Sequence, residues 1–178
     1  LAVPNDALEP LVSGLAAGGH FSAGQILLHT SGRYGVEVLR GARSAGAIGI
    51  AMHPAMTFTG LSLDLARLQT ATFGVTAPGP FLPIAQALAV EMGGEPVVIA
   101  EGDRPLYHAA LSHASNHMVT LVGQASQILS GIGVEDPSHV LGPLLRATLD
   151  NALASGDSAL TGPVVRGDAG TVEAHRQI

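Results

Sequence analysis

Residues 26–52 read ILLHTSGRYGVEVLRGARSAGAIGIAM: a short apolar run, a helical pattern and a second short apolar run. The apolar runs at Ile26–Thr30 and Ile48–Met52 have the length and composition of buried strands, and Tyr34–Ala45 between them fits a helix. A strand, a crossover helix and a second strand form the repeating unit of parallel sheets. The pattern therefore predicts an α/β layer around a parallel sheet covered by helices.

The same alternation extends to both sides of this stretch. Further strands are predicted at Leu1–Val3, Phe73–Thr76 and Val97–Ala100, and further helices at Asp6–Ala17 and Leu82–Met92. The first of these helices would be capped by the side chain of Asn5 or Asp6. Leu1–Val3 is shorter than the mean strand of about 5–6 residues. We therefore expect that the chain begins inside an element and that the sheet lacks its first strands.

A change of pattern after Glu101 predicts a second domain. Long helical segments follow at Leu106–Ser130 and Ser138–Ala154, and a short last helix follows at Thr171–Gln177. Residues 101–105, Glu-Gly-Asp-Arg-Pro, have the composition of a turn or linker. The expected organisation is the C-terminal part of an α/β domain at residues 1–102, followed by an all-helical domain at residues 103–178.

The composition excludes several classes of chemistry. The chain has 178 residues and a formal net charge of −6, all of its basic residues are Arg, and it has no Cys. A negative chain without a basic stripe is not expected to bind nucleic acid. The absence of Lys and Cys excludes Schiff-base chemistry, thiolate catalysis and Cys-ligated zinc. No uncharged apolar run approaches the ~20 residues of a membrane span, and we expect a cytoplasmic protein with no membrane contact.

The predicted helix at Leu106–Ser130 carries a polar stripe without formal charge. At about 100° per residue, His113, Asn116 and His117 fall on one side of the helix. No Asp, Glu, Lys or Arg occurs between Pro105 and Val134. A face that meets water normally carries charges, so the stripe predicts a mostly buried helix. Its hydrogen-bonding and proton-carrying groups would then face a substrate.

Two other interpretations of this stripe are open. Its polar groups could meet at a helix bundle or at a dimer interface. His113 and His117 also have the spacing of two metal ligands on a helix. Ala114, however, stands where zinc proteases have Glu, and the helix offers no third ligand. We therefore expect no metal.

Polar and small residues follow three of the predicted strands. They are Val3-Pro4-Asn5, His29-Thr30-Ser31-Gly32 and His53-Pro54-Ala55-Met56-Thr57. Ligands of parallel α/β sheets bind beyond the carboxyl ends of the strands, and Thr30, Ser31 and the backbone of Gly32 would let a ribose or phosphate approach closely. Ordinary turn chemistry explains such residues equally well.

His53 and Arg166 are two further candidates. Pro54 holds His53 in an extended conformation, and a neutral imidazole there would bond a carbonyl or carry a proton near neutral pH. A structural bond to a neighbouring backbone group is the alternative. The guanidinium of Arg166 suits a carboxylate or phosphate, or would pair with Asp168, which is well placed to cap the final helix.

Five segments together resemble a known family. In chain order they read LAVPNDAL (1–8), HTSG (29–32), HPAMTFTG (53–60), YHAALSHASNH (107–117) and LTGPVVRGD (160–168). They are similar to an uncharacterised bacterial family of Rossmann-like oxidoreductases whose C-terminal half is a domain of unknown function. That family is similar in layout to pyrroline-5-carboxylate reductases and β-hydroxyacid dehydrogenases.

The resemblance implies an NAD(P)-binding Rossmann domain and a helical C-terminal domain that forms a homodimer. It also implies that the glycine-rich cofactor fingerprint lies in strands that precede this chain. Val3 and Pro4 would then lie near the nicotinamide ribose, and Thr30, Ser31 and Gly32 would follow the next strand. His113 and Asn116 occupy the place where hydroxyacid dehydrogenases have a Lys and an Asn. Because the Lys is missing, a His would supply the proton.

Two functions follow from these patterns. The first is an oxidoreductase that uses NADP or NAD to transfer a hydride to or from a small carbonyl, hydroxy acid or imine. The residues assigned to the proton and the reacting atom are His113, Asn116 and His117, and those assigned to the substrate wall and its acid group are His53, Thr57, Thr120 and Arg166. The second is a non-catalytic ligand-binding or dimerisation module with the same fold.

Overall fold

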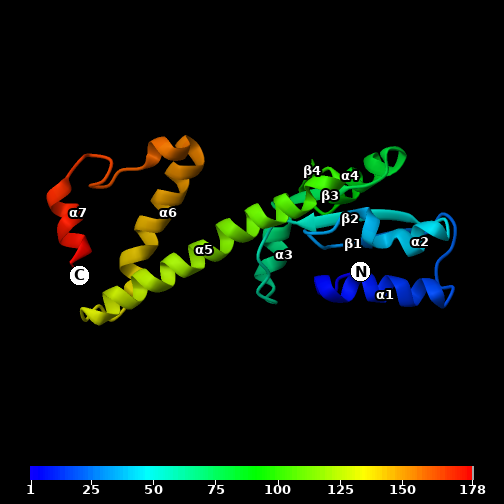
Figure 1. Ribbon diagram of the computed structural model, residues 1–178, viewed down its shortest axis with the longest axis horizontal. Coiled ribbons are helices and arrows are strands. Elements are labelled where there is room, and N and C mark those ends of the chain that lie inside the picture. Colours follow the sequence, from blue (N-terminus) through cyan, green and yellow to red (C-terminus); the bar gives the residue numbers. More distant parts are fainter. Residues whose placement is uncertain (178) are drawn as a thin grey trace. The chain divides into compact units, whose positions relative to one another are not determined.

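The structure is a computed structural model that describes residues 1–177. The chain divides into two compact units, Leu1–Ser115 and Asn116–Ile178. The first contains a sheet with its helices, and the second is helical (Figure 1). The predicted α/β layer followed by a helical region is therefore confirmed.

Four strands form the sheet of the first unit in the order β1-β2-β3-β4. They are β1 (Ile26–His29), β2 (Ile48–Pro54), β3 (Thr72–Thr76) and β4 (Glu95–Val98). β1 pairs with β2 in parallel, and so does β3 with β4, as predicted. β2 and β3 are antiparallel, so the prediction of a purely parallel sheet is wrong for this pair.

The connection between β2 and β3 explains the antiparallel pair. A parallel return requires a crossover element that packs on the sheet. Residues 55–71 contain only the short helix α3 (Leu63–Leu68), which the sequence patterns did not predict and in which Asp64 alone is buried. The chain therefore turns back and enters β3 from the edge at which β2 ends.

The first residues of the chain lie beside β1. The backbone nitrogen of Leu1 donates to Leu28 O, and Thr30 N donates to Leu1 O at 3.2 Å. This is the hydrogen-bond pattern of a parallel pair. The strand predicted at Leu1–Val3 is thus reduced to one paired residue, yet it brings Pro4 and Asn5 to the edge where β1 ends.

Helices cover the two faces of the sheet. On one face, α1 (Asn5–Ala17), η1 (Val36–Leu39) and α2 (Arg40–Ser44) pack around Leu27. On the other, α4 (Leu82–Glu91), which follows the short turn η2 (Gly79–Phe81), packs on a second cluster that contains Ile50 and Phe73. Adjacent side chains of a strand point to opposite faces, which is why Leu27 belongs to the first cluster and Leu28 contacts the second.

α5 (Arg104–Gly131), after the short turn η3 (Glu101–Asp103), begins in the first unit and continues in the second. Arg104 is the only buried residue of α5. The prediction that this helix is mostly buried is therefore wrong for the single chain. Helical periodicity reports which residues share a face, but not whether another element covers that face.

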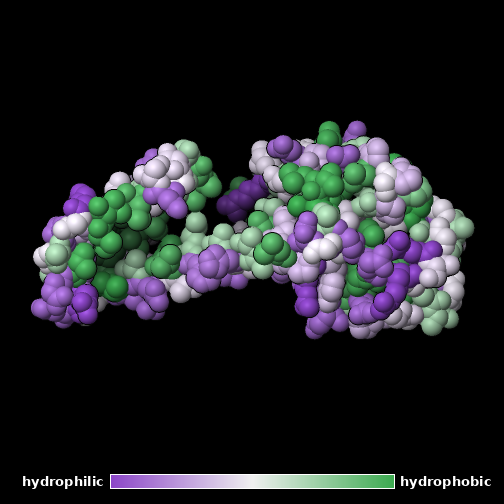
Figure 2. Space-filling model, turned by 45° about the horizontal axis from the view of Figure 1, so that its top comes forward, coloured by the Kyte–Doolittle hydropathy of each residue, from purple (hydrophilic) through white to green (hydrophobic). Residues whose placement is uncertain are grey.

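The second unit also contains α6 (Pro137–Ser155), η4 (Gly156–Ala159) and α7 (Ala169–Arg176). Asp168 caps α7 by accepting hydrogen bonds from Thr171 N at 3.1 Å and from Thr171 Oγ1, as predicted. Among the described residues of this unit, Leu141 is the only buried one. Figure 2 shows many apolar side chains on its surface. No helix in the described part of the chain is long and apolar enough to cross a membrane.

Candidate functional site

Three chain segments meet at the carboxyl edge of β1 and β2. The Ser31 hydroxyl donates to Asn5 Oδ1 at 2.6 Å and accepts from Tyr34 N, which joins the turn after β1 to the start of α1. Asn5 is thus not the predicted cap of α1; Pro4 precedes this helix, and no side chain caps it. Gly32 lies against His53, because a Cβ added to Gly32 would stand 2.9 Å from His53 Nε2.

His53 is the centre of this edge. Its Nδ1 lies 3.0 Å from the hydroxyl of Tyr107, which projects from the first turn of α5. The rings of Tyr107 and His108 both meet the His53 ring edge to face, with centroid distances of 5.7 and 6.3 Å. Tyr107 can reach His53 because it lies across Gly74 of β3, where a Cβ would stand 2.6 Å from the Tyr107 hydroxyl oxygen.

The surroundings of His53 keep its imidazole neutral. Burial is the main cause that lowers the pKa of His53 to about 4, and the nearby Arg104 guanidinium and His108 ring contribute to the same shift. Burial also raises the pKa of Tyr107. A neutral imidazole has one donor and one acceptor nitrogen. The contact at Nδ1 therefore lets a proton pass between the phenol and the ring.

Arg104 fastens the start of α5 to the sheet. Its exposed fraction is 0%. Its Nε donates to Thr76 Oγ1 at 2.7 Å, and Nη2 donates to Ala51 O at 3.0 Å and to Gly74 O at 2.9 Å. Nη1 donates to Ser31 O at 3.4 Å. One side chain thus joins α5 to the turn after β1, to β2 and to β3, and this holds Tyr107 and His108 over the carboxyl edge.

A cavity of about 420 Å³ opens beside His53. It is lined by Ala2, Thr30, His53, Pro54, Met56 and Phe58. Ala2 and Thr30 come from the edge at β1, and the others come from the end of β2 and the segment after it. The cavity is therefore small and mostly apolar, with one imidazole and one hydroxyl as its side-chain hydrogen-bonding groups.

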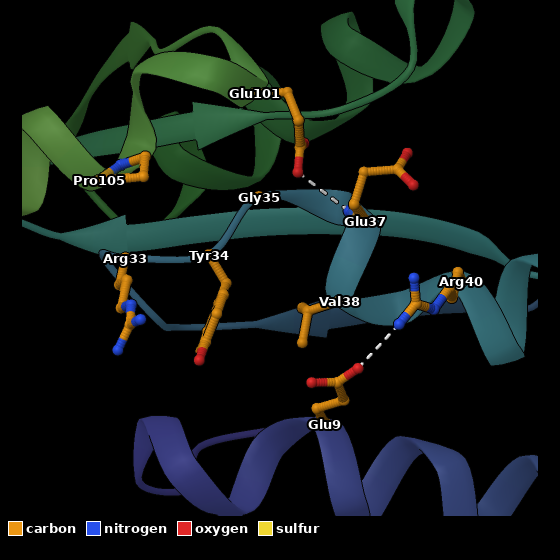
Figure 3. Close-up of a pocket in the computed structure, with 9 residues that line it drawn as sticks. All are labelled: Glu9, Arg33, Tyr34, Gly35, Glu37, Val38, Arg40, Glu101 and Pro105. Atoms are coloured by element: carbon orange, nitrogen blue, oxygen red, sulfur yellow. Dashed lines mark hydrogen bonds and ion pairs between the residues drawn. The ribbon is translucent and has the colours of Figure 1, made fainter.

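A second cavity, of about 270 Å³, lies next to Glu101 (Figure 3). The Glu101 carboxylate accepts hydrogen bonds from Val36 N at 2.7 Å and Glu37 N at 3.1 Å. An ion pair of 2.9 Å between Arg40 and Glu9 borders the cavity. Residues 101–105, which have the composition of a linker, are thus bound to the sheet and to η1.

The structure places the predicted cofactor residues in different surroundings. Thr30 lines the larger cavity. Val3 packs against the cluster around Leu27, and Pro4 is exposed ahead of α1. Ser31 and Gly32 are buried in the turn after β1.

The predicted substrate and proton residues are also dispersed. His53 lines the cavity, and Thr57 is exposed in the segment that follows. In the second unit Asn116, His117, Thr120 and Arg166 are exposed, and Thr120 Oγ1 donates to Asn116 O at 3.0 Å.

His113 belongs to the first unit and is exposed. It follows Arg104 by nine positions, which puts it about 180° around the helix from that residue. Since Arg104 faces the sheet, His113 is directed away from it. The catalytic roles assigned to His113, Asn116 and His117 stay predictions.

The patterns in the sequence did not single out Arg104, Tyr107 and His108. These residues stand at positions i, i+3 and i+4 of α5, so they share one face of its first turn. That spacing was the available signal. It was missed because the uncharged stripe around His113 lies on the other side of the same helix. No group of three or more His, Asp or Glu side chains that could hold a metal occurs within residues 1–177.

Two family models match the chain. Residues 1–54 match the Rossmann-like domain, and residues 71–178 match the domain of unknown function DUF2520. The chain belongs to the DUF2520 family. This confirms the resemblance to Rossmann-like proteins with a C-terminal domain of unknown function. The DUF2520 match begins at the start of β3, so this family's domain includes β3, α4 and β4 as well as the helical region.

Solved structures share the fold. Protein TM1727 from Thermotoga maritima is 28% identical to this chain with a TM-score of 0.77, over 99% of this chain and 67% of that one. The "putative NADP oxidoreductase BF3122" from Bacteroides fragilis is 19% identical with a TM-score of 0.75, over 98% and 64%. A "Putative oxidoreductase" from Mycobacterium avium 104 is 20% identical with a TM-score of 0.58, over 89% and 54%.

The DUF2520 chain described here thus spans about two thirds of the length of the first two of these proteins. No curated protein is significantly similar to it in sequence.

Proposed function

We propose that this chain is part of an NAD(P)-dependent oxidoreductase that acts on a small carbonyl compound, hydroxy acid or imine. The observation that carries the proposal is the His53–Tyr107 pair, which stands beside a cavity at the carboxyl edge of a Rossmann-like sheet. Ligands of such sheets bind at this edge. The names of two of the similar structures, both oxidoreductases, support the reaction class.

The residues at this edge fit a nicotinamide. Ala2 and Thr30 are small where they line the cavity, so a flat ring can approach the backbone, and the Thr30 hydroxyl can hydrogen-bond an amide or a ribose. Gly32 has no Cβ, and its neighbours His53 and His108 fill that space. When bound, the nicotinamide supplies or accepts the hydride.

The side chains of this chain supply the proton that accompanies the hydride transfer. His53 touches the cavity and is the catalytic residue of the proposal. The Tyr107 hydroxyl contacts the other ring nitrogen, Nδ1, and does not line the cavity. With Nε2 protonated, His53 donates this proton to the substrate oxygen or nitrogen while Nδ1 takes the proton of the Tyr107 hydroxyl. The imidazole remains neutral throughout, in agreement with its lowered pKa. The negative charge is left on the phenol oxygen, close to Arg104, until water returns the proton.

The test uses the full-length protein with NADPH or NADH and a panel of small ketones, oxo acids and cyclic imines. His53→Gln is expected to lower kcat by about 10²–10⁴-fold, the range for the loss of a general acid. The matched control is His20→Gln, which changes an exposed His. His113→Ala compares the two candidate sites. If His113→Ala abolishes turnover and His53→Gln does not, the proton donor belongs to the stripe and the proposal is wrong.

We also propose that the chain forms a homodimer through its second unit. Only one described residue of this unit is buried, although a folded unit normally buries an apolar core. Val119 and Leu121 of α5 are 72% and 63% exposed. Because α5 carries no formal charge beyond Arg104, an uncharged surface complements it. A second copy offers such a surface.

Sedimentation velocity tests the homodimer. Leu121→Glu is expected to convert a dimer into a monomer, and Val90→Glu, at an exposed position of α4, is the control. A monomeric parent protein contradicts the proposal. A dimer that persists in Leu121→Glu shows that another surface forms it. If the dimer forms and no substrate is turned over, the non-catalytic dimerisation module is the better description.

A further inference from the structure

We infer that the substrate at His53 is a carbonyl compound, or the corresponding alcohol, rather than an imine, because the site is built around a buried positive charge with no directly bonded carboxylate. The inference rests on the proposed oxidoreductase function and narrows its substrate class. Its evidence is the set of groups around Arg104, His53 and the larger cavity.

The positive charge belongs to Arg104. Its hydrogen bonds go to one hydroxyl and three backbone carbonyls, all of them neutral. Buried charges in proteins are normally paired with an opposite charge. Glu101 is the carboxylate that acts on Arg104 from nearby, but its oxygens accept from Val36 N and Glu37 N, and it lines the other cavity. No ion pair to Arg104 occurs within the described part of the chain.

The groups that face His53 also include no carboxylate. They are the Tyr107 hydroxyl, the His108 ring, the backbone of Gly32 and, further in, the Arg104 guanidinium. None of them is a carboxylate or carries a negative charge. The remaining side chains that line the cavity, those of Ala2, Thr30, Pro54, Met56 and Phe58, carry no charge. Within residues 1–177, no carboxylate lines this cavity.

The two reductions place opposite demands on such a site. When a reduced nicotinamide gives a hydride to a carbonyl carbon, the C=O π pair moves to oxygen, and this oxygen gains negative charge until it takes a proton. An imine is reduced as the protonated iminium, which is already a cation. A positive charge buried in a site of low polarity stabilises the developing oxyanion and repels the iminium. A site for an iminium would need a carboxylate instead.

Arg104 also stabilises the proton donor after the proton has left. Its guanidinium carbon lies 5.8 Å from the centre of the Tyr107 ring. As the phenol gives its proton to His53, the oxygen becomes negative; burial disfavours this form, and the nearby cation offsets part of that cost. The same charge therefore assists both the substrate oxygen and Tyr107. In the carbonyl reaction each step moves negative charge toward Arg104.

The experiment compares ketones and imines of the same ring size in the full-length protein. Cyclopentanone and 1-pyrroline have the same ring size, and cyclohexanone and 1-piperideine form a second pair. We expect kcat/KM to be at least tenfold higher for each ketone than for its imine. Arg104→Met is expected to reduce kcat/KM for each ketone by at least tenfold more than kcat/KM for its imine. A preference for the imines overturns the inference.

A binding measurement without cofactor provides a second readout. Calorimetry with cyclopentanecarboxylate and cyclopentylammonium compares an anion with a cation on the same ring. The carboxylate is expected to bind at least tenfold more tightly than the ammonium, and Arg104→Met should remove the difference. Equal binding, or tighter binding of the ammonium, overturns the inference.

A charge-preserving variant and the overall turnover distinguish failure of the substrate class from failure of the proposed oxidoreductase function. Arg104→Lys keeps the charge and is expected to retain the preference for the anion, even if Arg104→Met unfolds. If it loses this preference while remaining folded by circular dichroism, the buried charge is not the cause and the inference is wrong. Turnover of neither ketones nor imines contradicts the proposed oxidoreductase itself. Turnover with a preference for imines contradicts only the substrate class.

Discussion

Tyr107 Oη and His53 Nδ1 are 3.0 Å apart, although 54 positions of sequence separate the two residues. The contact joins the first turn of α5 to the end of β2. It exists because Arg104, three residues before Tyr107, is bound to the carbonyls of Ala51 and Gly74.

Tyr107→Phe removes the hydroxyl that lies 3.0 Å from His53 Nδ1 and, in the proposed mechanism, gives its proton to that ring. We expect kcat to fall by about 10²-fold or more, near the lower end of the range for general acid–base catalysis, with little change in KM. The free energy of unfolding should fall by only about 0.5–1.5 kcal/mol, the typical net contribution of one hydrogen bond to stability. Steady-state kinetics and urea unfolding measure the two quantities. An unchanged kcat would show that Tyr107 has only a structural role.

Gly32→Ala puts a methyl group where there is no room for one. Its Cβ would lie 2.7 Å from His108 Cδ2 and 2.9 Å from His53 Nε2, so both rings must move. A misplacement of about 1 Å in a catalytic group can cost about 10²-fold in rate, and we expect a loss of that order. Gly14→Ala is the matched control, because nothing lies within 4 Å of its Cβ in α1. It should leave the rate unchanged and raise stability by about 0.5–1 kcal/mol.

Glu101→Ala removes the acceptor of two backbone N–H groups. Val36 N and Glu37 N would then have no partner in the protein, and each unsatisfied donor costs about 1–3 kcal/mol when water cannot replace the bond. Val36 is buried, whereas Glu37 is exposed to water. We therefore expect a loss of about 2 kcal/mol in urea unfolding. Glu91→Ala, at an exposed position of α4, should change stability by less than about 0.5 kcal/mol.

Acid should destabilise the first unit through His29. Burial lowers the pKa of His29 from 6.5 to about 4, while Nε2 donates to Gly35 O at 2.8 Å and Nδ1 accepts from Ser31 N at 3.1 Å. The unfolded chain therefore binds a proton between pH 6.5 and 4 that the folded chain does not. The contribution of His29 to stability is present above pH 6.5 and is lost as the pH falls toward 4, by about 3 kcal/mol in all.

Urea unfolding at intervals between pH 7.5 and 4.5 measures this loss. The pKa of His53 is lowered as well, so protonation of this residue also makes the free energy of unfolding fall as the pH decreases. His29→Asn should make the slope shallower, since one of the two groups is gone. A stability that rises on acidification over this interval would show that the buried imidazoles accept protons in the folded state.

Much of the fold could be predicted because its signals are local. β1, β2 and β3 start within one residue of their predicted positions, and α4 ends one residue from its predicted end. The antiparallel pairing of β3 could not be predicted in the same way. Alternation of apolar and polar residues reports burial of a strand, but not the direction of its neighbour. The exposed residues of α3 gave no periodic signal either.

In the candidate site, too, the residues with local sequence signals could be predicted and those that depend on long-range contacts could not. The sequence pattern was sufficient to find the strand ends at Thr30 and His53, because parallel strands place their carboxyl ends at one edge. Tyr107 and His108 were overlooked because their importance depends on contacts with residues more than 50 positions away. Arg104 was assigned to a linker by its neighbours Gly102, Asp103 and Pro105.

Apolar periodicity, turn residues and the missing Lys and Cys therefore established the α/β layer, the helical second half and the classes of chemistry that this chain cannot perform. These properties depend on residues that are close together in sequence. The tertiary structure alone decided which face of α5 meets the sheet. That choice depends on Arg104, whose guanidinium is stable in the interior only where carbonyls from separate strands and the turn after β1 converge to accept its hydrogen bonds.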